Sequence, residues 1–477
     1  MRVLIVPEVY RPEDASSSGT LNDAVSWVEQ WLRRDETMHV YWLLPPRERA
    51  NYDEGDVLAD RERVTLVEAE PFMADNPRGS MFTENGYTED QLTALEAAVH
   101  EQGAYVDVVV DQLRTGRFTL KKWLLDHTDH WAAQVRPFDV VANVHDLQVP
   151  FKYRYCRYRD AYQMRMELCG TAFADGIWFT AGIDAAAFRE HASEYLRRDV
   201  VESALDGAIE SGSPVEFDRF EERYGDEPEW LHVAGSLWSK KHADEVLAVA
   251  ETLYREFGVR TLMTSMESIP DEYRRREWVD AHSEASRETY EWALEKGDIA
   301  VCASEYETMA RTPFEQAASG QVLLLRDEPW IYDCVPEGHP LVADADALES
   351  LAARAVEDWD EAIAANRGLV EHAKEIRSPE RCGRRTLRDL RSRVESKVER
   401  YALGGPDAAV ELALEDEPTV ELDDVAERTA EFTEDGRPVT ARESYARTDL
   451  LYALRSLGYE DRGNPGTPTF RRTGRWT

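Results

Sequence analysis

The sequence predicts an α/β protein with two doubly wound, mostly parallel sheets. Short apolar runs alternate with amphipathic helical stretches along most of the 477 residues, as is typical of parallel strands buried on both faces. A polar stretch with glycine and proline at residues 221–229 divides the pattern into two blocks. A strongly acidic stretch follows the second block. We therefore expect two domains of ordinary size and a small C-terminal module.

The first domain is predicted over residues 1–220. It begins with a buried strand at Val3–Val6, a polar turn, and a helix whose apolar positions from Leu21 to Leu32 have helical spacing. Further strands are expected at residues 40–44, 64–67, 106–110, 140–144 and 176–179. Residues 70–91 have few apolar side chains and no clear period, which indicates an exposed insertion.

The second domain is predicted over residues 228–402. Its strands are expected at residues 231–236, 261–263, 299–302, 322–325 and 341–342, and a helix follows the first of them. Neither domain contains a Gly-x-Gly-x-x-Gly sequence. A dinucleotide cofactor is therefore not expected.

The segment from Asp298 to Arg326 carries the most chemical information. It reads as strand, loop, helix, glycine and strand, with Glu307 at the carboxyl end of the first strand and Glu315 early in the helix. Open α/β sheets bind ligands at the carboxyl ends of their strands, so both carboxylates are candidate binding groups. Thr312 to Glu315 also fits a capping box with proline at the first helical position, which is the structural alternative for Glu315.

The turn after the first strand of the second domain is a candidate phosphate site. It holds Lys240 and Lys241, two of only eight lysines in the chain. A diphosphate requires cations and a helix amino terminus, and a strand-to-helix turn offers both. A solvated helix start is the alternative interpretation.

Taken in order, these motifs resemble those of retaining GT-B glycosyltransferases of the glycosyltransferase family 4 type. Glu315–Gly320 and the strand after it match the family pattern closely, and Lys241 falls on the phosphate-binding lysine. Two departures stand out, because Thr308–Ala310 replace the family's Phe-Gly-Leu and Ser236 replaces an arginine. Weaker matches lie at residues 138–147, 174–180 and 213–220, so the resemblance covers roughly residues 3–345.

The resemblance implies two Rossmann-like domains that face each other across a cleft, and a role for each matched residue. Lys241 would hold the diphosphate, Glu315 the ribose and Glu307 the sugar or a phosphate. His145, at the end of a strand, would orient the transferred sugar and stabilise developing charge. A His–Asp pair that caps the strand structurally is the alternative. Further candidate binding residues are Gly19, Asp146, Ser236 and Arg311, the last as a replacement for the missing positive charge or as an ordinary surface arginine.

The implied activity is transfer of a hexose-type sugar from a nucleoside diphosphate to an unknown saccharide, lipid or small-molecule acceptor, with retention of configuration. The resemblance also implies that no cofactor and no metal is required, since lysine, arginine and helix termini meet the phosphate charge. One alternative is a nucleic-acid-associated binding or regulatory protein with a catalytically degenerate GT-B scaffold. Another is a GT-B sugar-nucleotide epimerase.

Composition constrains the surroundings of the protein. The net charge is −38, with 8 lysines against 48 arginines, and the acids are spread along the whole chain. This is typical of a halophile's solvated surface, although a very acidic mesophile would look similar. No apolar run approaches the length of a membrane span, and no signal peptide precedes the first strand, so we expect a cytoplasmic protein. Five cysteines without a Cys-x-x-Cys pair indicate neither a zinc site nor a disulfide framework.

The C-terminal region differs in composition from the rest. Residues 403–427 are predicted to form an acidic linker, because nine acids and no base occur between Gly405 and Glu427. Residues 428–477 are predicted to form a small winged-helix-like α+β module, with helices followed by a hairpin over residues 459–472. From Arg462 onward there are four arginines and no acid, which could contact nucleic-acid phosphates. We favour slightly the alternative, an accessory or dimerisation module whose arginines pair with the acidic linker.

Overall fold

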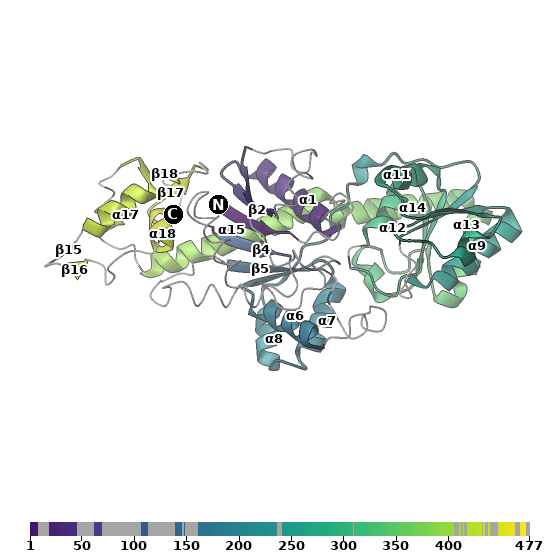
Figure 1. Cartoon of the computed structure of the whole chain (residues 1–477), viewed down its shortest axis with the longest axis horizontal. Helices are drawn as coiled ribbons and strands as arrows, with labels where there is room; N and C mark the ends of the chain where they lie inside the picture. Colours follow the sequence, from purple (N-terminus) through teal and green to yellow (C-terminus); the bar gives the residue numbers. More distant parts are fainter. Residues whose placement is uncertain are drawn as a thin grey trace.

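The structure, a computed structural model, consists of two α/β domains and a small C-terminal module. Figure 1 shows the N-terminal domain between the other two parts. The described residues are 1–7, 19–44, 62–68, 106–112, 139–145, 147, 161–235, 241–308, 310–404, 410–411, 414, 417–431, 433–434, 437–438, 447–462 and 468–473. Among them, no helix combines the length and the apolar character that crossing a membrane requires. The insertion expected at residues 70–91 lies outside the described residues.

The N-terminal domain is built on a parallel sheet with the strand order β3-β2-β1-β4-β5-β6-β7. The strands are β1 (Arg2–Val6), β2 (His39–Leu44), β3 (Val64–Glu68), β4 (Val108–Asp111), β5 (Asp139–Val144), β6 (Gly176–Phe179) and β7 (Ile209–Glu210). All the predicted strands of this domain are present, and β7 is additional. The strand order reverses between β1 and β4, and such a switch point is where open α/β sheets bind ligands.

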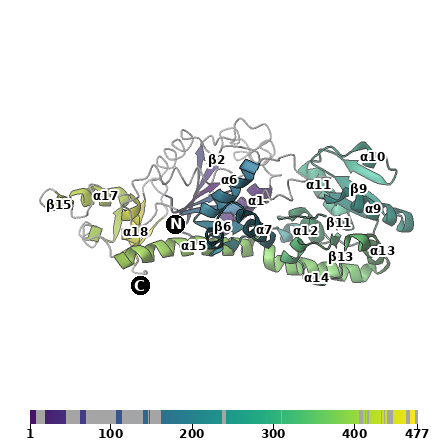
Figure 2. The ribbon, with the colours of Figure 1, turned by 90° about the horizontal axis from the view of Figure 1, so that it is seen from below.

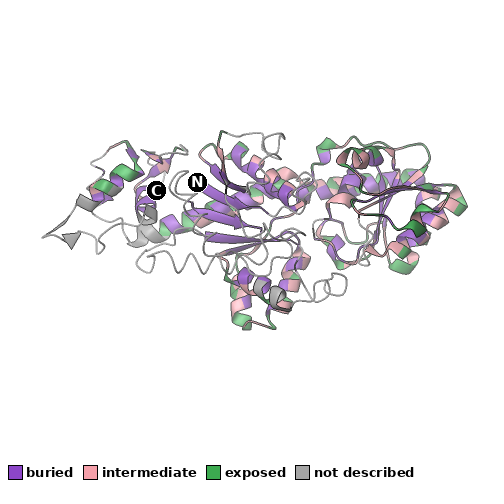
Figure 3. Cartoon of the chain, in the orientation of Figure 1, coloured by how far each residue is buried: buried purple, intermediate pink, exposed green. Residues whose placement is uncertain are grey.

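Both faces of this sheet are covered, so its central strands β1, β4, β5 and β6 are buried throughout (Figure 3). Neighbouring residues along a strand point to opposite faces, and accordingly Val141 and Ala142 belong to different hydrophobic clusters. The helix α1 (Gly19–Arg34) covers one face, where Trp27 and Trp31 contact Trp178 edge to face. The other face is covered by α6 (Ala161–Phe173), α7 (Gly182–Ala192) and α8 (Arg198–Leu205).

The second domain contains a parallel sheet with the order β10-β9-β8-β11-β12-β13, which reverses between β8 and β11. Its strands are β8 (Trp230–Ala234), β9 (Arg260–Thr264), β10 (Val279–His282), β11 (Ile299–Cys302), β12 (Val322–Arg326) and β13 (Val342–Ala343). Its helices are α9 (Ala243–Phe257), α10 (Asp271–Arg274), α11 (Arg287–Lys296), α12 (Arg311–Ala318), α13 (Leu348–Glu357) and α14 (Trp359–Arg377), with short 3-10 turns η5 (Phe217–Arg219), η7 (Pro329–Asp333) and η8 (Ala345–Ala347). The predicted strands are confirmed, and β10 is additional.

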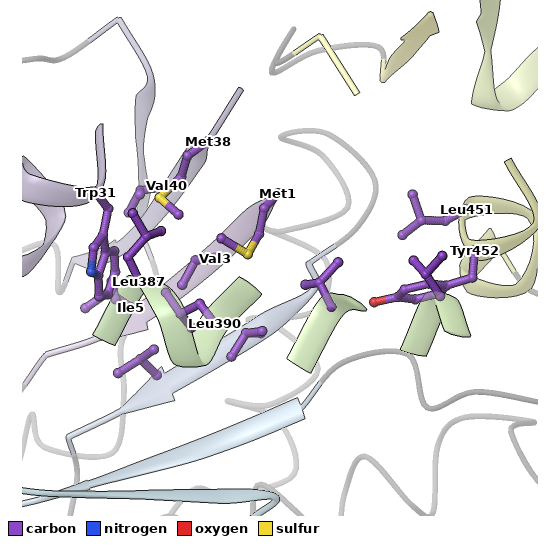
Figure 4. Packing of buried hydrophobic residues seen from close by; sticks show 14 of the residues in the cluster. Met1, Val3, Ile5, Trp31, Met38, Val40, Leu387, Leu390, Leu451 and Tyr452 are labelled. Carbon is purple, nitrogen blue, oxygen red and sulfur yellow. The ribbon is translucent and has the colours of Figure 1, made fainter. Parts of the chain in front are cut away.

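A long helix, α15 (Pro379–Gly404), carries the chain from the second domain back to the first. Figure 2 shows it running along the N-terminal domain, from α14 to the C-terminal module. Its apolar side chains, including Leu387 and Leu390, pack with Val3 and Trp31 in the same core (Figure 4). The core of the N-terminal domain is therefore completed by residues from the far end of the sequence.

The C-terminal module is small and α+β, as predicted. It contains β14 (Thr419–Glu421), α17 (Leu422–Glu431), β15 (Thr433–Glu434), β16 (Arg437–Pro438), α18 (Arg447–Ser456), β17 (Tyr459–Asp461) and β18 (Thr469–Arg472). The predicted hairpin is present as the antiparallel pair of β17 and β18, and β14 joins it on the other side of β18. Composition alone assigns residues 403–427 to a linker, yet β14 and the start of α17 fall within this range. The segment is structured because Val420 and Leu422 are buried in the core.

The module is joined to the N-terminal domain by buried ion pairs as well as by apolar contacts. Arg455 of α18 donates to both carboxylate oxygens of Asp107, just before β4, at 2.6 and 2.9 Å. Arg2 of β1 donates to Asp461 of β17 at 2.8 Å. Leu451 and Tyr452 of α18 lie in the cluster that contains the first strands (Figure 4). Within the module, Arg428 pairs at 2.7 Å with Glu417 of the acidic stretch.

Candidate functional site

The candidate site lies at the carboxyl edge of the second sheet, where the strand order reverses between β8 and β11. Lys241 follows β8 and Glu307 follows β11, and the Lys241 ammonium donates a hydrogen bond to the Glu307 carboxylate. The two side chains are 27% and 13% exposed, so the pair is partly shielded from water. The structure thus brings together two residues that the sequence places 66 positions apart.

The second glutamate, Glu315, lies in the middle of α12 and is almost fully buried. Its Oε2 accepts a hydrogen bond from the Tyr290 hydroxyl at 2.9 Å, and its Oε1 lies 3.9 Å from Arg311 Nε. The capping-box interpretation is wrong, because α12 begins at Arg311 after Ala310 and no side chain caps it. Glu315 therefore accepts a hydrogen bond from Tyr290 and does not cap its own helix.

Two non-glycine residues that precede helices beside the candidate site adopt left-handed backbone angles. His242, with a φ of 47°, precedes α9, and Ala310, with a φ of 43°, precedes α12. Non-glycine residues rarely adopt this backbone conformation, because it costs on the order of 1–3 kcal/mol. Residues that do adopt it are concentrated at ligand-binding sites. Both residues sit where a helix amino terminus meets the candidate site, and the positive ends of the two helix dipoles favour an anion there.

Arg311 connects the site to the other domain. Its Nη1 donates to Asp23 Oδ1 of α1 at 2.7 Å, and Ser213 Oγ donates to the same oxygen at 2.8 Å. The Asp23 side chain is only 2% exposed. Burial raises the pKa of Asp23 to about 6, although the Arg311 charge opposes the shift. At neutral pH the carboxylate is therefore mostly ionised and able to hold the arginine.

A second bridge between the domains involves Tyr306, the residue before Glu307. The Tyr306 hydroxyl donates to Asp184 Oδ1 of α7 at 2.7 Å, and the same oxygen accepts from the backbone N–H of Leu147 at 3.4 Å. Leu147 lies two residues after the buried His145 at the end of β5. The loops that carry Glu307 and His145 thus meet at one carboxylate.

Other predicted residues lie nearby or outside the described chain. Gly19 is the first residue of α1, and the next residue, Thr20, accepts a hydrogen bond through its carbonyl oxygen from Gln112, which follows β4. Asp146 and Ser236 lie outside the described residues. Glu307 also lines a small interdomain cavity of about 30 Å³, which is enough for a water molecule. The cavity's other lining residues include Thr180, Glu210, Trp330, Asp333 and Arg377.

Four residues of the site are not among the sequence-predicted ones: Asp23, Asp184, Tyr290 and Tyr306. Each lies on a helix or loop with no recognisable motif of its own and enters the site through a contact distant in sequence. Tyr306 was the most accessible of them to sequence reasoning, since it stands next to Glu307. Asp23 gives a weaker indication, as an acid between two apolar positions, Leu21 and Ala24, of the first predicted helix.

Comparison with known proteins supports the fold. No protein-family model and no curated protein matches the sequence. The structure of HepE from Anabaena in complex with UDP and glucose is similar, with a TM-score of 0.57 and 10% identity, covering 82% of this chain and 100% of that chain. Sucrose-phosphate synthase from Thermosynechococcus elongatus has a TM-score of 0.56 and 15% identity, covering 82% and 98% of the two chains.

A third similar structure is the N-terminal domain of trehalose-6-phosphate phosphatase from Candida albicans, with a TM-score of 0.57 and 12% identity, covering 82% of this chain and 97% of that one. At such low identities the similarity concerns the fold. Together with the two parallel sheets and their facing carboxyl edges, it shows that the chain has the GT-B fold.

Proposed function

We propose that the protein is a glycosyltransferase that moves a hexose-type sugar from a nucleoside diphosphate to an acceptor hydroxyl with retention of configuration. The observation that carries the proposal is the convergence of Lys241, Glu307, Arg311 and Glu315 at the switch point of the second sheet. Cations, carboxylates and two helix amino termini at one sheet edge suit a ligand with a diphosphate at its centre and hydroxyl groups at its ends.

In this proposal the diphosphate lies over the amino termini of α9 and α12, with Lys241 as its principal cation. The Lys241–Glu307 pair holds the ammonium in place before the ligand arrives, which lowers the entropy cost of binding. Arg311 adds a second cation at the start of α12, in place of the arginine that Ser236 replaces. No metal is needed, since these groups balance the phosphate charge.

The two carboxylates and the histidine bind the groups on either side of the diphosphate, the ribose and the transferred sugar. Glu315 accepts hydrogen bonds from the ribose, and Glu307 binds the sugar or a phosphate. His145 approaches from the N-terminal domain and orients the sugar near the reacting carbon. With retention, the acceptor enters on the face from which the diphosphate leaves, so the departing phosphate can take the acceptor's proton. That HepE was crystallised with UDP and glucose favours a UDP-sugar as donor.

Ligand-induced thermal stabilisation tests the proposal. The midpoint of thermal unfolding is measured in molar KCl with UDP-, GDP-, ADP- and TDP-sugars. The wild type and the Lys241→Ala and Glu315→Ala variants are compared. A ligand at a hundred times its Kd adds about 2.7 kcal/mol of stability, which shifts the midpoint visibly. We expect one nucleotide class to raise the midpoint of the wild type and neither substituted protein to respond.

Lys296→Ala provides a matched control. Lys296 ends α11 and lies over the Trp230 ring at the amino end of β8, so the control removes a lysine at the opposite edge of the same sheet. Its response to the ligand should match that of the wild type. If no sugar nucleotide shifts the folded wild type, the proposal fails. A nucleic-acid-associated protein that uses the exposed Arg462, Arg471 and Arg472 then becomes the better hypothesis.

A further inference from the structure

The contact between Tyr290 and Glu315 links two helices that share no motif. Tyr290 lies in α11 and Glu315 in α12, and their side chains meet at 2.9 Å in a partly buried position. A carboxylate can only accept at this contact, so the phenol must donate. Burial, together with the negative charge of Glu315, raises the pKa of Tyr290 well above its ordinary value. The hydroxyl therefore stays protonated over the physiological range.

Tyr290 is itself held in place. The guanidinium of Arg287, one turn earlier in α11, lies 5.5 Å from the centre of the Tyr290 ring and is anchored at 2.8 Å to Glu291. The phenol thus has little freedom to follow a moving carboxylate. A fixed donor on Oε2 restricts rotation of the Glu315 carboxylate and leaves Oε1 on the side of Arg311, which starts α12.

Building on the proposed function, we propose that Tyr290 is a positioning residue that aims Glu315 at the ribose of the donor and thereby makes the site select ribonucleotides over deoxyribonucleotides. The Glu315 carboxylate can stabilise a bound ribose by a hydrogen bond only if the oxygen that does not bond Tyr290 points at a ribose hydroxyl. When the hydroxyl is missing, a buried carboxylate loses a partner it cannot regain from water. Removing the phenol hydroxyl should therefore weaken selection for ribose more than it weakens binding of the diphosphate.

The test is a comparison of ligands across variants. Dissociation constants for UDP, GDP and ADP, and for the 2′-deoxy and 3′-deoxy forms of each, are measured by titration calorimetry on the full-length wild type, Tyr290→Phe and Tyr332→Phe. Tyr332 serves as the control, since its hydroxyl also donates to a carboxylate, Asp327 at 2.7 Å, but on the exposed surface. The ratio of ribo to deoxy affinity is the readout, because a general loss of stability would not change it.

In the wild type we expect one nucleotide to bind, with a preference of about tenfold or more for ribose over at least one deoxy form, the usual size of a hydrogen bond to a charged group. In Tyr290→Phe this preference should fall to about threefold or less, while the deoxy form keeps its affinity within about twofold. Tyr332→Phe should retain the full preference.

The outcomes separate the inference from the proposed function. An unchanged ribose preference in Tyr290→Phe overturns the inference. A wild type that binds nucleotides without any ribose preference overturns it too, but leaves the donor class standing. Absence of any nucleotide binding overturns both. If Tyr290→Phe does not fold, Glu315→Gln is measured instead, because it keeps the size of the side chain but removes the charge, and the inference requires that it lose the ribose preference.

Discussion

Replacing Arg455 by methionine is expected to release the C-terminal module from the N-terminal domain. The substitution keeps most of the side-chain length but removes the charge from a pair in which the two side chains are 5% and 0% exposed. Breaking such a pair by removing one partner costs about 3–5 kcal/mol. Asp107 would keep its bonds from the Arg2 backbone and the Tyr452 hydroxyl, at 2.8 and 3.3 Å. We therefore expect the lower end, about 3 kcal/mol.

Hydrogen exchange measures this effect locally. A loss of about 3 kcal/mol should speed exchange of the α18 amides by about a hundredfold, provided they exchange through opening of the module. Helix α13 in the second domain should keep its protection. Arg462→Met is the control, since Arg462 is exposed and lies in the same module. Unchanged exchange of α18 in Arg455→Met would refute the reasoning, and so would an equal loss of protection in α13.

The charge left behind provides an independent check. Adding Asp107→Asn to Arg455→Met should recover part of the lost protection, because the uncompensated buried carboxylate is gone. Burial would raise the pKa of Asp107, but Arg455 beside it holds that pKa well below its ordinary value of 3.8. A carboxyl with a lowered pKa stabilises the folded state above its unfolded pKa and loses this effect as the pH falls. Protection of α18 in the wild type should therefore decline below about pH 4.

Two further predictions concern Asp23 and Gly320. The raised pKa of Asp23, about 6 against an ordinary 3.8, means that its contribution to stability is complete below about pH 4 and is lost as the pH rises through 6. In urea unfolding between pH 4 and 8, Asp23→Asn should remove about 2–3 kcal/mol of pH dependence relative to the wild type, and parallel profiles for the two proteins would contradict this. Gly320→Ala should lower the thermal midpoint clearly, because Gly320 has a φ of 93° and an added Cβ would lie 2.1 Å from the Arg223 carbonyl oxygen. Gly338→Ala, with a φ of 74° and open space around it, should cost only about 1 kcal/mol, and similar losses at the two glycines would contradict the steric argument.

The parallel strands were predictable because burial on both faces produces continuous apolar runs, as in β12 with its sequence VLLLR. The strands β7 and β10 were not, for physical reasons. The first is only two residues long, and the second, VDAH, is an edge strand whose last three residues are only partly buried. Backbone pairing with a neighbouring strand places them, and that pairing leaves no hydrophobic pattern in the sequence.

The site divides in the same way. The approach of Lys241 to Glu307 followed from the rule that parallel strands end at a common edge. The partners of Glu315 and Arg311 could not be predicted in this way. Tyr290 and Asp23 lie on helices whose sequences would form the same helices without a ligand nearby. Likewise, residues 419–422 were assigned to an acidic linker, because acids dominate the composition of this stretch. Its two buried side chains, Val420 and Leu422, are too few to produce a recognisable pattern.

The return of the chain along α15 has a consequence for synthesis on the ribosome. Arg2 pairs with Asp461, 459 residues later, and the first strand packs against side chains of α15 and α18. At roughly 5–20 residues per second, more than twenty seconds separate the emergence of these partners. During that interval one face of the N-terminal sheet has α1 but lacks the part of its cover that α15 and α18 supply, whereas the second domain is complete in sequence before these two helices emerge. The second domain can therefore fold first, and the nascent N-terminal sheet is the part of the chain most in need of a chaperone.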